Sequence, residues 1–516
     1  MPELYPFQRE DMEKLVPLHR GAIGSEMGTG KTPVAVEIEK AWYDDLKTRG
    51  KDHYGTLVVA PLNTFDGWRK RYDEWSPESD LVQIDRKNRE AFIQAVRMKR
   101  GDVFLTHWES LRLMPELRNY PFATIIADEA HRMAARNNQQ TQSLKMLRTF
   151  NKLAMSGTMS ADHPAGLWSP FHWLYPQEHF VTSYWRFYKL LVDYEIDYNK
   201  GSGYHKILGV NLDNIHRLHE FMDPFWVRHL KRGPCCAHHP QGVMSWLPEK
   251  VYDRIWIDLL PKQRKVYEAM KAELLAWVGE NEDKPLAAPI EMVKMTRLSQ
   301  ISLAMPDIRI VTHRRFLKHG EQFSPKVVKA LKMVSSLPDG DWWLVEEEEV
   351  FLIEPSEKLD RGVELFKDHP NKQFVAYTSS KHFLRLAMAR FAKVGITATS
   401  ISGDVNSETE RTARKDMFIR GDVQVILIMI QASEGIDGLQ EATDTAVFFD
   451  RSQSARMNMQ AEDRLHRDGQ KNTVQIIDIM ARNTVDLGRH QRLKHKWEWL
   501  KLLLGDKVNQ ETGEER

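Results

Sequence analysis

Short apolar runs rich in β-branched residues recur in two blocks of the chain. The first block holds runs at 56–61, 102–107, 124–127 and 152–156, and the second holds runs at 373–378, 396–402, 423–430, 445–450 and 474–480. The runs lack the alternation of a half-exposed strand, so they predict strands buried on both faces, as in a parallel sheet. Helical patterns lie between them, for example at 90–100, 140–149 and 381–393. This order predicts an α/β fold with two doubly wound parallel-sheet domains.

The stretch between the two blocks is rich in Trp, Tyr, His and charged residues and is mostly helical in period. At 516 residues the chain is too long for a single core. We expect a first domain at 1–225 with a helical insertion from about 160, a linker at 226–250, and a second domain at 251–516 with a helical protrusion at about 260–370. A basic amphipathic helix at 488–504 is expected to pack on the second domain, and a DNA or partner surface is the alternative.

The composition is that of a globular protein, because 42% of the residues are hydrophobic and 28% are charged. Lys and Arg number 73 and Asp and Glu number 72, so the net charge is only +1 and nucleic-acid binding must come from local patches. The two cysteines form no disulfide framework, which fits a reducing compartment. We see no secretory signal and no apolar stretch of about 18 residues, so we expect a cytoplasmic protein that does not contact membranes.

A glycine-rich turn, GSEMGTGKT, occupies positions 24–32 and leads into a helical pattern at 33–42. Backbone N–H groups must approach phosphate oxygens closely, which only small residues permit, and a helix N-terminus favours negative charge. In this arrangement Lys31 reaches the β- and γ-phosphates and Thr32 holds Mg²⁺. Ser25 stands where the strict pattern has glycine, so the turn alone leaves an ordinary loop open.

The sequence DEAH follows the buried run at 124–127, about 100 residues after the lysine of the turn. A carboxylate at the end of a parallel strand lies where a doubly wound sheet places ligand chemistry. Asp128 is expected to hold Mg²⁺ through water, and Glu129 is expected to polarise the attacking water.

Two arginines far along the chain complete this set. Gln460, Arg464 and Arg467 are spaced i, i+4 and i+7, so on a helix they share one face. Guanidinium groups can offset the charge that spreads over a transferred phosphoryl group, although pairing with neighbouring carboxylates is the structural alternative. The three separated elements together predict one nucleotide held between two domains.

These residues resemble the Swi/Snf-type ATPases of the superfamily-two, DEAH-bearing helicases. The matching segments cover nearly all of the chain and lie at 4–8, 26–32, 60–68, 105–112, 154–160, 226–232, 247–270, 374–380, 401–418, 426–450 and 460–486. The spelling Arg-x-x-Arg-x-Gly-Gln in the last segment separates this type from its DEAD-box relatives. The resemblance implies two RecA-like domains, ATP and Mg²⁺ as cofactors, and double-stranded DNA as the preferred partner.

The resemblance also implies roles for individual positions. Those implied for ATP are Gln8, Gly28, Thr29, Gly30, Lys31 and Thr32, with Asp128 and Thr32 on the metal. Those implied for catalysis are Glu129, Gln460, Arg464 and Arg467. Those implied for coupling hydrolysis to domain movement are Ser156, Gly157, Thr158, Gly435 and Asp437. Those implied for the DNA backbone are Asn63, Thr106, Thr378, Ser379 and Ser433, whose small polar groups suit contacts that position a protein without reading sequence.

We therefore expect a DNA-stimulated ATP hydrolase that moves on double-stranded DNA, with single-stranded or branched DNA as further partners. Because the motor consumes nearly the whole chain, we expect a compact phage or bacterial member, in the host cytoplasm if phage-encoded. A strand-separating DNA or RNA helicase is one alternative. Another is a DNA-binding scaffold subunit that does not hydrolyse ATP, which the intact Lys31, Glu129 and arginine pair disfavour.

Overall fold

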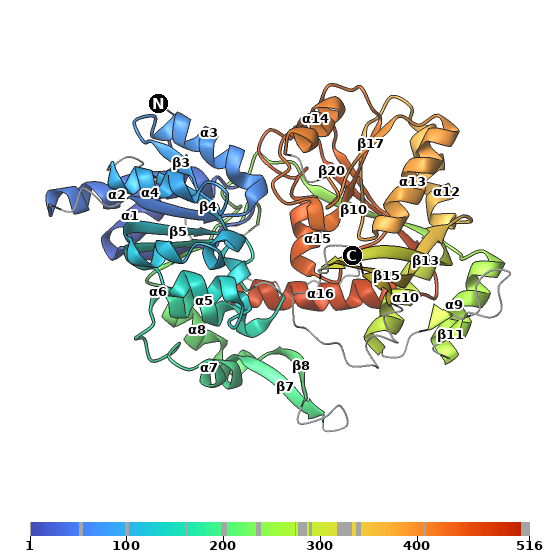
Figure 1. Ribbon diagram of the computed structural model, residues 1–516, viewed down its shortest axis with the longest axis horizontal. Coiled ribbons are helices and arrows are strands. Elements are labelled where there is room, and N and C mark those ends of the chain that lie inside the picture. The colour runs from blue at the N-terminus through green and yellow to red at the C-terminus, as the bar shows by residue number, and fades with distance from the viewer. Residues whose placement is uncertain are drawn as a thin grey trace.

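The computed structural model describes residues 2–50, 55–98, 103–160, 162–197, 204–233, 239–273, 275–276, 286–287, 291–316, 333–336, 342–405 and 408–506. Two α/β lobes lie side by side, each built on its own parallel sheet (Figure 1). The predicted α/β class with two parallel-sheet domains is thus confirmed.

The first lobe contains a seven-stranded sheet in which every pairing is parallel. Its strands, in spatial order, are β3 (Leu81–Gln83), β4 (Val103–His107), β2 (Thr56–Ala60), β5 (Pro121–Asp128), β6 (Arg148–Met155), β1 (Arg20–Ile23) and β9 (Trp226–Val227). Its helices are α1 (Pro6–Leu15), α2 (Lys31–Thr48), α3 (Phe65–Trp75), α4 (Arg89–Arg97), α5 (Gln139–Lys145), α6 (Trp168–Leu174), α7 (Tyr184–Leu191) and α8 (Ile215–Met222).

The second lobe contains a six-stranded sheet, also parallel throughout. Its strands, in spatial order, are β10 (Lys250–Ile257), β20 (Val474–Ala481), β19 (Thr445–Phe448), β16 (Phe374–Thr378), β18 (Val425–Met429) and β17 (Ala398–Ile401). Its helices include α12 (Glu357–Asp368), α13 (Lys381–Val394), α14 (Glu408–Ile419) and α15 (Ala455–Glu462).

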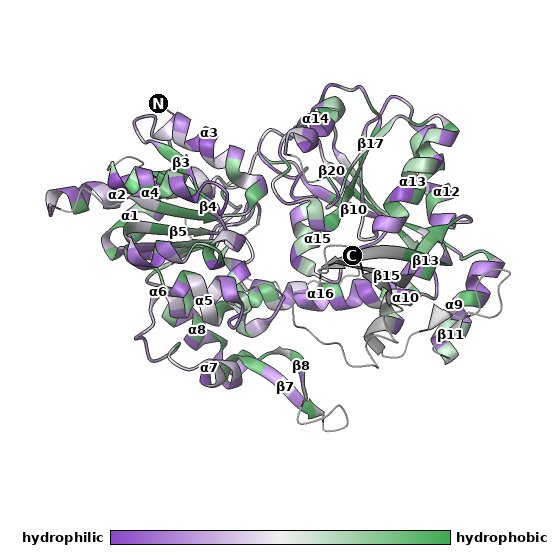
Figure 2. Ribbon diagram, in the orientation of Figure 1, coloured by the Kyte–Doolittle hydropathy of each residue, from purple (hydrophilic) through white to green (hydrophobic). Residues whose placement is uncertain are grey.

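Each sheet separates two apolar cores, as strands buried on both faces require. In β2 the fully buried Val58 joins one core, while its neighbours Leu57 and Val59 join the other. In β16, Val375 and Ala376 divide between two cores in the same way. Figure 2 shows the apolar strands inside each lobe with more polar helices around them.

The region predicted as a helical protrusion is helical only in part. It contains α9 (Pro261–Glu273) and α10 (Glu291–Leu303), the short pair β11 (Leu275–Ala276) and β12 (Leu286–Ala287), and an antiparallel sheet of β13 (Met305–Phe316), β15 (Trp342–Ile353) and β14 (Met333–Ser336). Beside its helices the region thus contains a sheet, in which the alternating apolar positions Ile308 and Ile310 belong to a strand. The first insertion likewise contains a hairpin of β7 (Val192–Asp197) and β8 (Tyr204–Val210).

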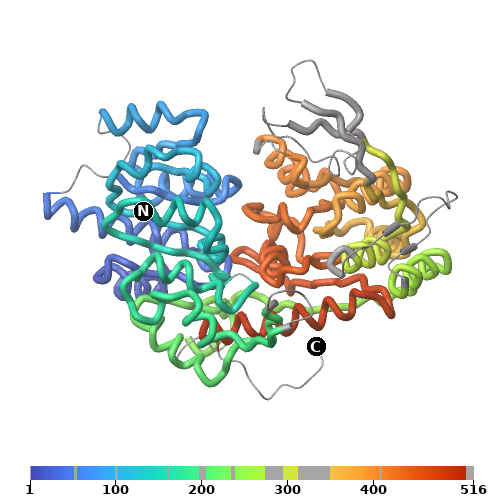
Figure 3. Tube along the Cα trace, turned by 60° about the horizontal axis from the view of Figure 1, so that its bottom comes forward, coloured from blue at the N-terminus to red at the C-terminus, as the bar shows by residue number. Residues whose placement is uncertain are grey.

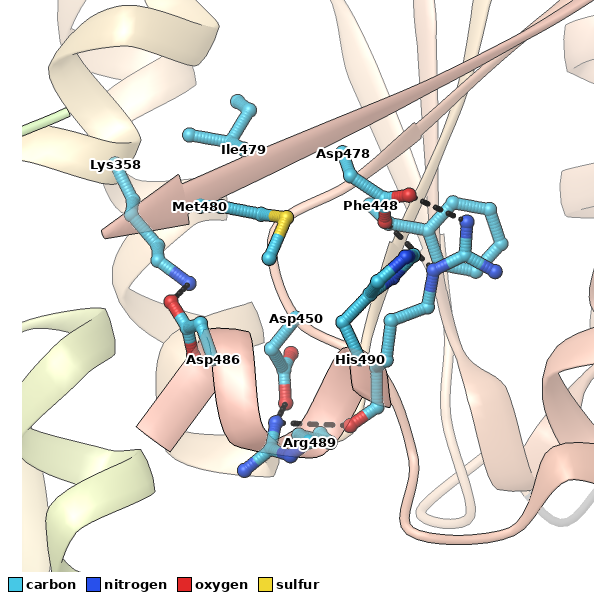
Figure 4. Close-up of a pocket in the computed structure, with 10 residues that line it drawn as sticks. Lys358, Phe448, Asp450, Asp478, Ile479, Met480, Asp486, Arg489 and His490 are labelled. Carbon is cyan, nitrogen blue, oxygen red and sulfur yellow. Dashed lines mark hydrogen bonds and ion pairs between the residues drawn. The ribbon is translucent and has the colours of Figure 1, made fainter. Parts of the chain in front are cut away.

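The last helix, α16 (Val485–Leu504), joins the two lobes. Its first turn is fixed in the second lobe, where Asp486 pairs with Lys358 at 2.7 Å and Arg489 lies 3.8 Å from Asp450 (Figure 4). Its last turn enters a core of the first lobe through Leu503 and Leu504. Figure 3 shows this helix running beneath both lobes. The helix therefore packs on the first lobe as well as on the second, where the sequence had placed it.

In the part of the chain that the structure describes, no helix is both long and apolar enough to cross a membrane.

Candidate active site between the lobes

The glycine-rich turn lies between β1 and α2, at the end of the strand next to the edge of the first sheet. Gly28 and Gly30 adopt left-handed conformations, with φ of 81° and 77°, which glycine reaches without steric cost. Lys31 opens α2, and its Nζ donates to the carbonyls of Ser25 and Glu26 at 2.9 Å each. The turn therefore folds back around the lysine, with backbone N–H groups at the start of a long helix.

Gln8 binds the back of this turn. Its side chain is buried, its Nε2 donates to the carbonyls of Thr29 and Gly30 at 3.0 and 3.2 Å, and its Oε1 accepts from the backbone of Tyr5 at 2.9 Å. Its role in ATP binding stays a prediction, but the structure places its side chain directly against the turn.

Asp128 and Glu129 stand at the carboxyl end of β5, and two indoles hold the first of them. Nε1 of Trp68 donates to Oδ2 of Asp128 at 2.9 Å, and Nε1 of Trp108 donates to its backbone carbonyl at 3.0 Å. Glu129 has a φ of 49°, an uncommon conformation for a residue with a Cβ, and functional sites often contain such strain.

Glu129 belongs to a buried cluster with the segment predicted to couple hydrolysis to movement. The hydroxyl of Ser156 donates to Oε2 of Glu129 at 3.0 Å, and His131 Nδ1 lies 3.0 Å from both groups. The backbone N–H of Thr158 in turn donates to the Ser156 hydroxyl at 3.2 Å. A movement of the Glu129 carboxylate would therefore displace Ser156 and Thr158 in the segment that follows β6.

The acid–base groups of this cluster have shifted pKa values. Burial, with the neighbouring charge of Glu129, raises the pKa of the Asp128 carboxyl to about 7. Burial acts to raise the pKa of Glu129 as well, but the hydrogen bond and charge of His131, with Lys31, hold it well below its usual range. Burial lowers the pKa of Lys31 to about 8 despite both carboxylates. The two adjacent carboxyls therefore differ in acidity, as an acid–base site requires.

The two arginines of the second lobe converge on one carboxylate, but not from one helix face. Helix α15 ends at Glu462, and the chain then continues in turns, so the predicted helical spacing is wrong beyond that point. Arg464 and Arg467 nevertheless converge, because both donate to Oδ1 of Asp437, the first at 3.0 Å. A Cβ placed on Gly28 would lie 3.2 Å from the Cβ of Arg467. The second lobe thus contacts the glycine-rich turn directly.

Further contacts close the cleft. Arg132 pairs with Glu434 at 2.9 Å, and Asn63 donates to the carbonyl of the same glutamate. Gly435, with a φ of 77°, packs against the backbone of Asn63. Asn63, predicted to contact DNA, therefore lies at the boundary between the lobes.

The other residues predicted to contact DNA use their hydroxyls within the protein. Thr106 is fully buried and donates to Ile84 O at 2.8 Å, and Ser433 donates to Ile430 O at 2.7 Å. Thr378 donates to Asp450 at 2.7 Å, and Ser379 donates to the same carboxylate. Their contact with DNA stays a prediction.

Sequence reasoning missed the linker lysine that ties the lobes together. Lys231 is only 2% exposed, its Nζ lies 2.9 Å from Asp463 and donates to His466 O at 2.7 Å, and its backbone N–H donates to Glu26 at 2.7 Å. The segment Trp226–Arg232 resembled the family, but the burial of Lys231 between groups of both lobes cannot be predicted from the residues next to it in sequence.

The site fits Mg²⁺ bound together with phosphates. Among the described residues no group of three or more His, Cys, Asp or Glu side chains is placed to hold a metal ion. Mg²⁺ usually binds through one or two carboxylates plus substrate phosphates. Asp128 can supply the carboxylate, and Lys31 and the half-buried Thr32 lie beside it for the phosphates and the metal. Nε2 of Gln460 and Nε of Arg464 are buried without a partner in the described chain, so these two donors of the second lobe remain available.

A family comparison decides the relationship. The family model of the SNF2-related domain matches residues 11–305, more than half of the chain. The chain belongs to this SNF2-related family. The resemblance to Swi/Snf-type proteins is thereby confirmed at the level of the family.

Individual relatives match the SNF2-related chain over almost its full length. It is 24% identical over 507 residues to the nuclear protein STH1/NPS1 of Saccharomyces cerevisiae. This alignment covers 94% of this chain and 33% of that protein. It is 23% identical over 490 residues to the CHD3-type chromatin-remodeling factor CHR7 of Arabidopsis thaliana. That alignment covers 92% of this chain and 35% of the plant protein. The chain thus spans about a third of the length of these relatives. They do not test a phage or bacterial origin, which stays a prediction.

Among solved structures, the Sulfolobus solfataricus SWI2/SNF2 ATPase core in complex with dsDNA aligns over 98% of both chains, at 17% identity and a TM-score of 0.40.

Proposed function

We propose that this SNF2-related chain is an ATP-driven motor that moves along double-stranded DNA. The observation that carries the proposal is the contact of Arg467 with Gly28, with Arg464 bound to the same Asp437. Arg467 of the second lobe thereby lies beside the loop that the first lobe would wrap around a triphosphate, and Arg464 shares its carboxylate partner. An ordinary surface ion pair does not require that position.

Lys31, Thr32 and Asp128 are the residues that would hold the substrate phosphates and Mg²⁺. The bound metal supplies charge neutralisation on the phosphate oxygens. Lys31 gives up its two backbone carbonyls and binds phosphate oxygens instead, which favours its protonated form. Asp128 would be ionised with the metal bound; the indole N–H of Trp68 keeps its carboxyl oriented, and that of Trp108 holds its backbone carbonyl.

Glu129 is the residue that would orient and deprotonate the attacking water. Its low pKa keeps it ionised at neutral pH, and the hydrogen bond from Ser156 holds the carboxylate in place. Arg464 and Arg467 leave Asp437 and offset the charge that develops on the transferred phosphoryl group. Turnover then requires both lobes.

Movement follows from contacts that depend on lobe closure. The pair Arg132–Glu434, the Asn63–Glu434 hydrogen bond and the Lys231 bridge all cross the cleft. Loss of the γ-phosphate removes the negative charge that attracts the two arginines, so the lobes separate and shift. The preference for duplex DNA is taken from membership of the SNF2-related family, and the DNA surface is proposed to include Asn63 and Ser379.

The test is ATP hydrolysis with duplex DNA, single-stranded DNA or RNA at equal nucleotide concentration, with triplex displacement and strand displacement in parallel. We expect the largest stimulation by duplex DNA, triplex displacement without strand displacement, and no turnover in Lys31→Ala. Glu129→Gln should still bind ATP but stop hydrolysis. Arg420→Gln, which changes an exposed arginine paired with Asp422, is the matched control. Stimulation only by RNA, or separation of duplex strands, would refute the proposed substrate and movement.

A further inference from the structure

The loop that carries the two arginines is held partly by the linker. This arginine loop, residues 463–468, follows α15 and contains neither helix nor strand. Leu465 fixes it to its own lobe, where the side chain is fully buried in an apolar core. The residues before the two arginines face the linker instead: Nζ of Lys231 lies 2.9 Å from Asp463 and donates to the carbonyl of His466 at 2.7 Å. One linker side chain thus binds the loop beside both arginines.

Two further residues of the linker bind the same loop. Nε2 of His466 lies 2.8 Å from the carbonyl of Pro248, and the indole N–H of Trp246 donates to Oδ1 of Asp468 at 3.3 Å. The linker therefore contacts the arginine loop at its start, middle and end. These contacts and the buried Leu465, rather than a helix or strand, fix the course of the loop.

The same part of the linker is bound to the glycine-rich turn of the first lobe. The backbone N–H of Lys231 donates to Oε2 of Glu26 at 2.7 Å, and the backbone N–H of Glu26 donates to the carbonyl of His229 at 2.9 Å. The backbone N–H of His229 in turn donates to the Ser25 hydroxyl at 3.1 Å. Lys231 therefore contacts the turn with its backbone and the arginine loop with its side chain.

The burial of Lys231 argues against a role in stability alone. The residue is 2% exposed, and a charge taken out of water costs free energy unless it is paired. A well-packed apolar side chain often stabilises a fold as much as a buried ion pair does, whereas charged and hydrogen-bonded partners must meet in one geometry. A buried ammonium between Asp463 and the carbonyl of His466 is therefore suited to fix where the loop lies.

We infer that Lys231 is a positioning residue, which sets the place of Arg464 and Arg467 relative to the glycine-rich turn. The reach of the two guanidiniums toward a triphosphate then depends on the linker as well as on the packing of the two lobes. A movement of the linker at this residue would displace both arginines together. The inference rests on the proposed ATP hydrolysis and deepens it, because it names the residue that aligns the cations of the second lobe with the turn.

The experiment removes the ammonium and keeps the length of the side chain, in Lys231→Met. Asp463 retains Lys250 as a partner at 2.9 Å, and the backbone contact with Glu26 does not involve the changed side chain. ADP affinity, measured by fluorescence, should therefore stay within about threefold of the wild type. The kcat at saturating duplex DNA should fall about tenfold to 100-fold, because a displacement of about 1 Å at the reacting groups can cost that much.

A double-mutant cycle distinguishes positioning from a general loss of structure. In a chain that carries Arg464→Ala and Arg467→Ala, Lys231→Met should change the rate by less than about twofold, because the groups that it positions are gone. Single-turnover hydrolysis of radiolabelled ATP measures these slow rates. A residue that only supports the fold would lower the rate by the same factor in both backgrounds.

Lys358→Met is the matched control. Lys358 is 1% exposed, lies 2.7 Å from Asp486 and donates to the carbonyl of Phe449 at 2.8 Å. It is therefore also a buried lysine with a carboxylate and a carbonyl as partners, but both partners lie outside the arginine loop. Whatever factor its loss costs in kcat should be the same with and without the two arginines.

The outcomes separate this inference from the proposed function. A wild-type chain whose hydrolysis duplex DNA does not stimulate refutes the motor. An active wild type refutes the role of Lys231 if Lys231→Met keeps the wild-type kcat, or if it lowers the rate equally with and without the two arginines. A Lys231→Met chain that no longer binds ADP also refutes this role, because the side chain would then maintain the fold and not the position of the loop.

Discussion

The indole N–H of Trp68 donates to the carboxylate of Asp128 over 2.9 Å, so an aromatic side chain of α3 tunes the acid at the end of β5. This hydrogen bond lowers a pKa that burial raises to about 7. The metal-binding form of Asp128 is therefore only partly populated at neutral pH before a cation is present. Magnesium binding should release a proton in this range, and α3 should influence the metal without touching it.

Trp68→Phe should raise the Mg²⁺ concentration needed for half-maximal ATP hydrolysis several-fold at about pH 6.5 and much less at about pH 8.5. Removing the donor raises the pKa of Asp128 further, so more of the carboxyl is protonated below neutrality. Trp75→Phe is the matched control, because Trp75 lies on the same helix and its buried Nε1 has no partner in the described chain. An equal Mg²⁺ requirement in both variants would contradict the assignment.

ADP affinity should fall as the pH rises through about 8, since burial lowers the pKa of Lys31 to about 8 and the neutral amine binds phosphate poorly. The positive charge of Lys31 is present below this pKa and is lost above it, so phosphate binding weakens as the pH rises. Lys31→Arg keeps its charge over the whole range and should show a flat profile, whatever its absolute affinity. Fluorescent ADP titrations without DNA measure both profiles. A wild-type profile as flat as that of the arginine variant would rule out a lowered pKa.

Strands β2 and β5 of the site's sheet could be predicted because they are almost fully buried, whereas the short β1 before the glycine-rich turn was missed. Runs such as 56–61 and 474–480 became β2 and β20 within a residue or two, and the end of β5 places Asp128 beside the lysine of α2. Strand β10 was missed because it lies at the edge of its sheet, where Val251 and Tyr252 are 44% and 52% exposed, and Asp253 and Arg254 interrupt its apolar residues. Burial on both faces leaves a clear signal in sequence, and an edge strand does not.

The contacts between the lobes could be predicted only as far as residue type. The arginine pair was found from its spacing, yet its helix ends at Glu462, and its convergence on Asp437 arises from turns. The hydrogen bond of Trp68 to Asp128 and the ion pair of Lys231 with Asp463 join segments that are distant in sequence. Such groups carry no local pattern, so only the folded chain shows that they meet.

Arg464→Ala and Arg467→Ala should each lower kcat by about 100-fold or more while leaving ADP affinity within about threefold. The reason is that ADP lacks the phosphoryl group whose developing charge these guanidiniums offset. Steady-state hydrolysis at saturating duplex DNA and fluorescent ADP binding measure the two quantities, with Arg420→Gln as the exposed control. A kcat near that of the wild type in either variant would mean that its pairing with Asp437 is the whole of its role.

The end of α16 should detach from the first lobe in Asp506→Ala. Arg228 binds Asp506 through two hydrogen bonds of 2.8 and 2.7 Å, with both side chains at most 10% exposed, and also donates to the carbonyls of Gly24 and Gly157. Removing one partner of a buried pair leaves an uncompensated charge and costs about 3–5 kcal/mol. Because the two lobes need not unfold together, this cost should appear as local opening rather than a shift of one global transition.

Hydrogen exchange of the peptide that covers the last two turns of α16 should therefore quicken by about 100-fold or more in Asp506→Ala, while exchange in the first turn, fixed by Asp486, stays as in the wild type. Asp258→Ala is the control, since it breaks an exposed pair with Arg482 and leaves α16 untouched. ATP hydrolysis should also lose part of its DNA stimulation, because Arg228 links the start of the glycine-rich turn and the coupling segment to this helix. Unchanged protection of the last turns would show that Leu503 and Leu504 alone hold α16 against the first lobe.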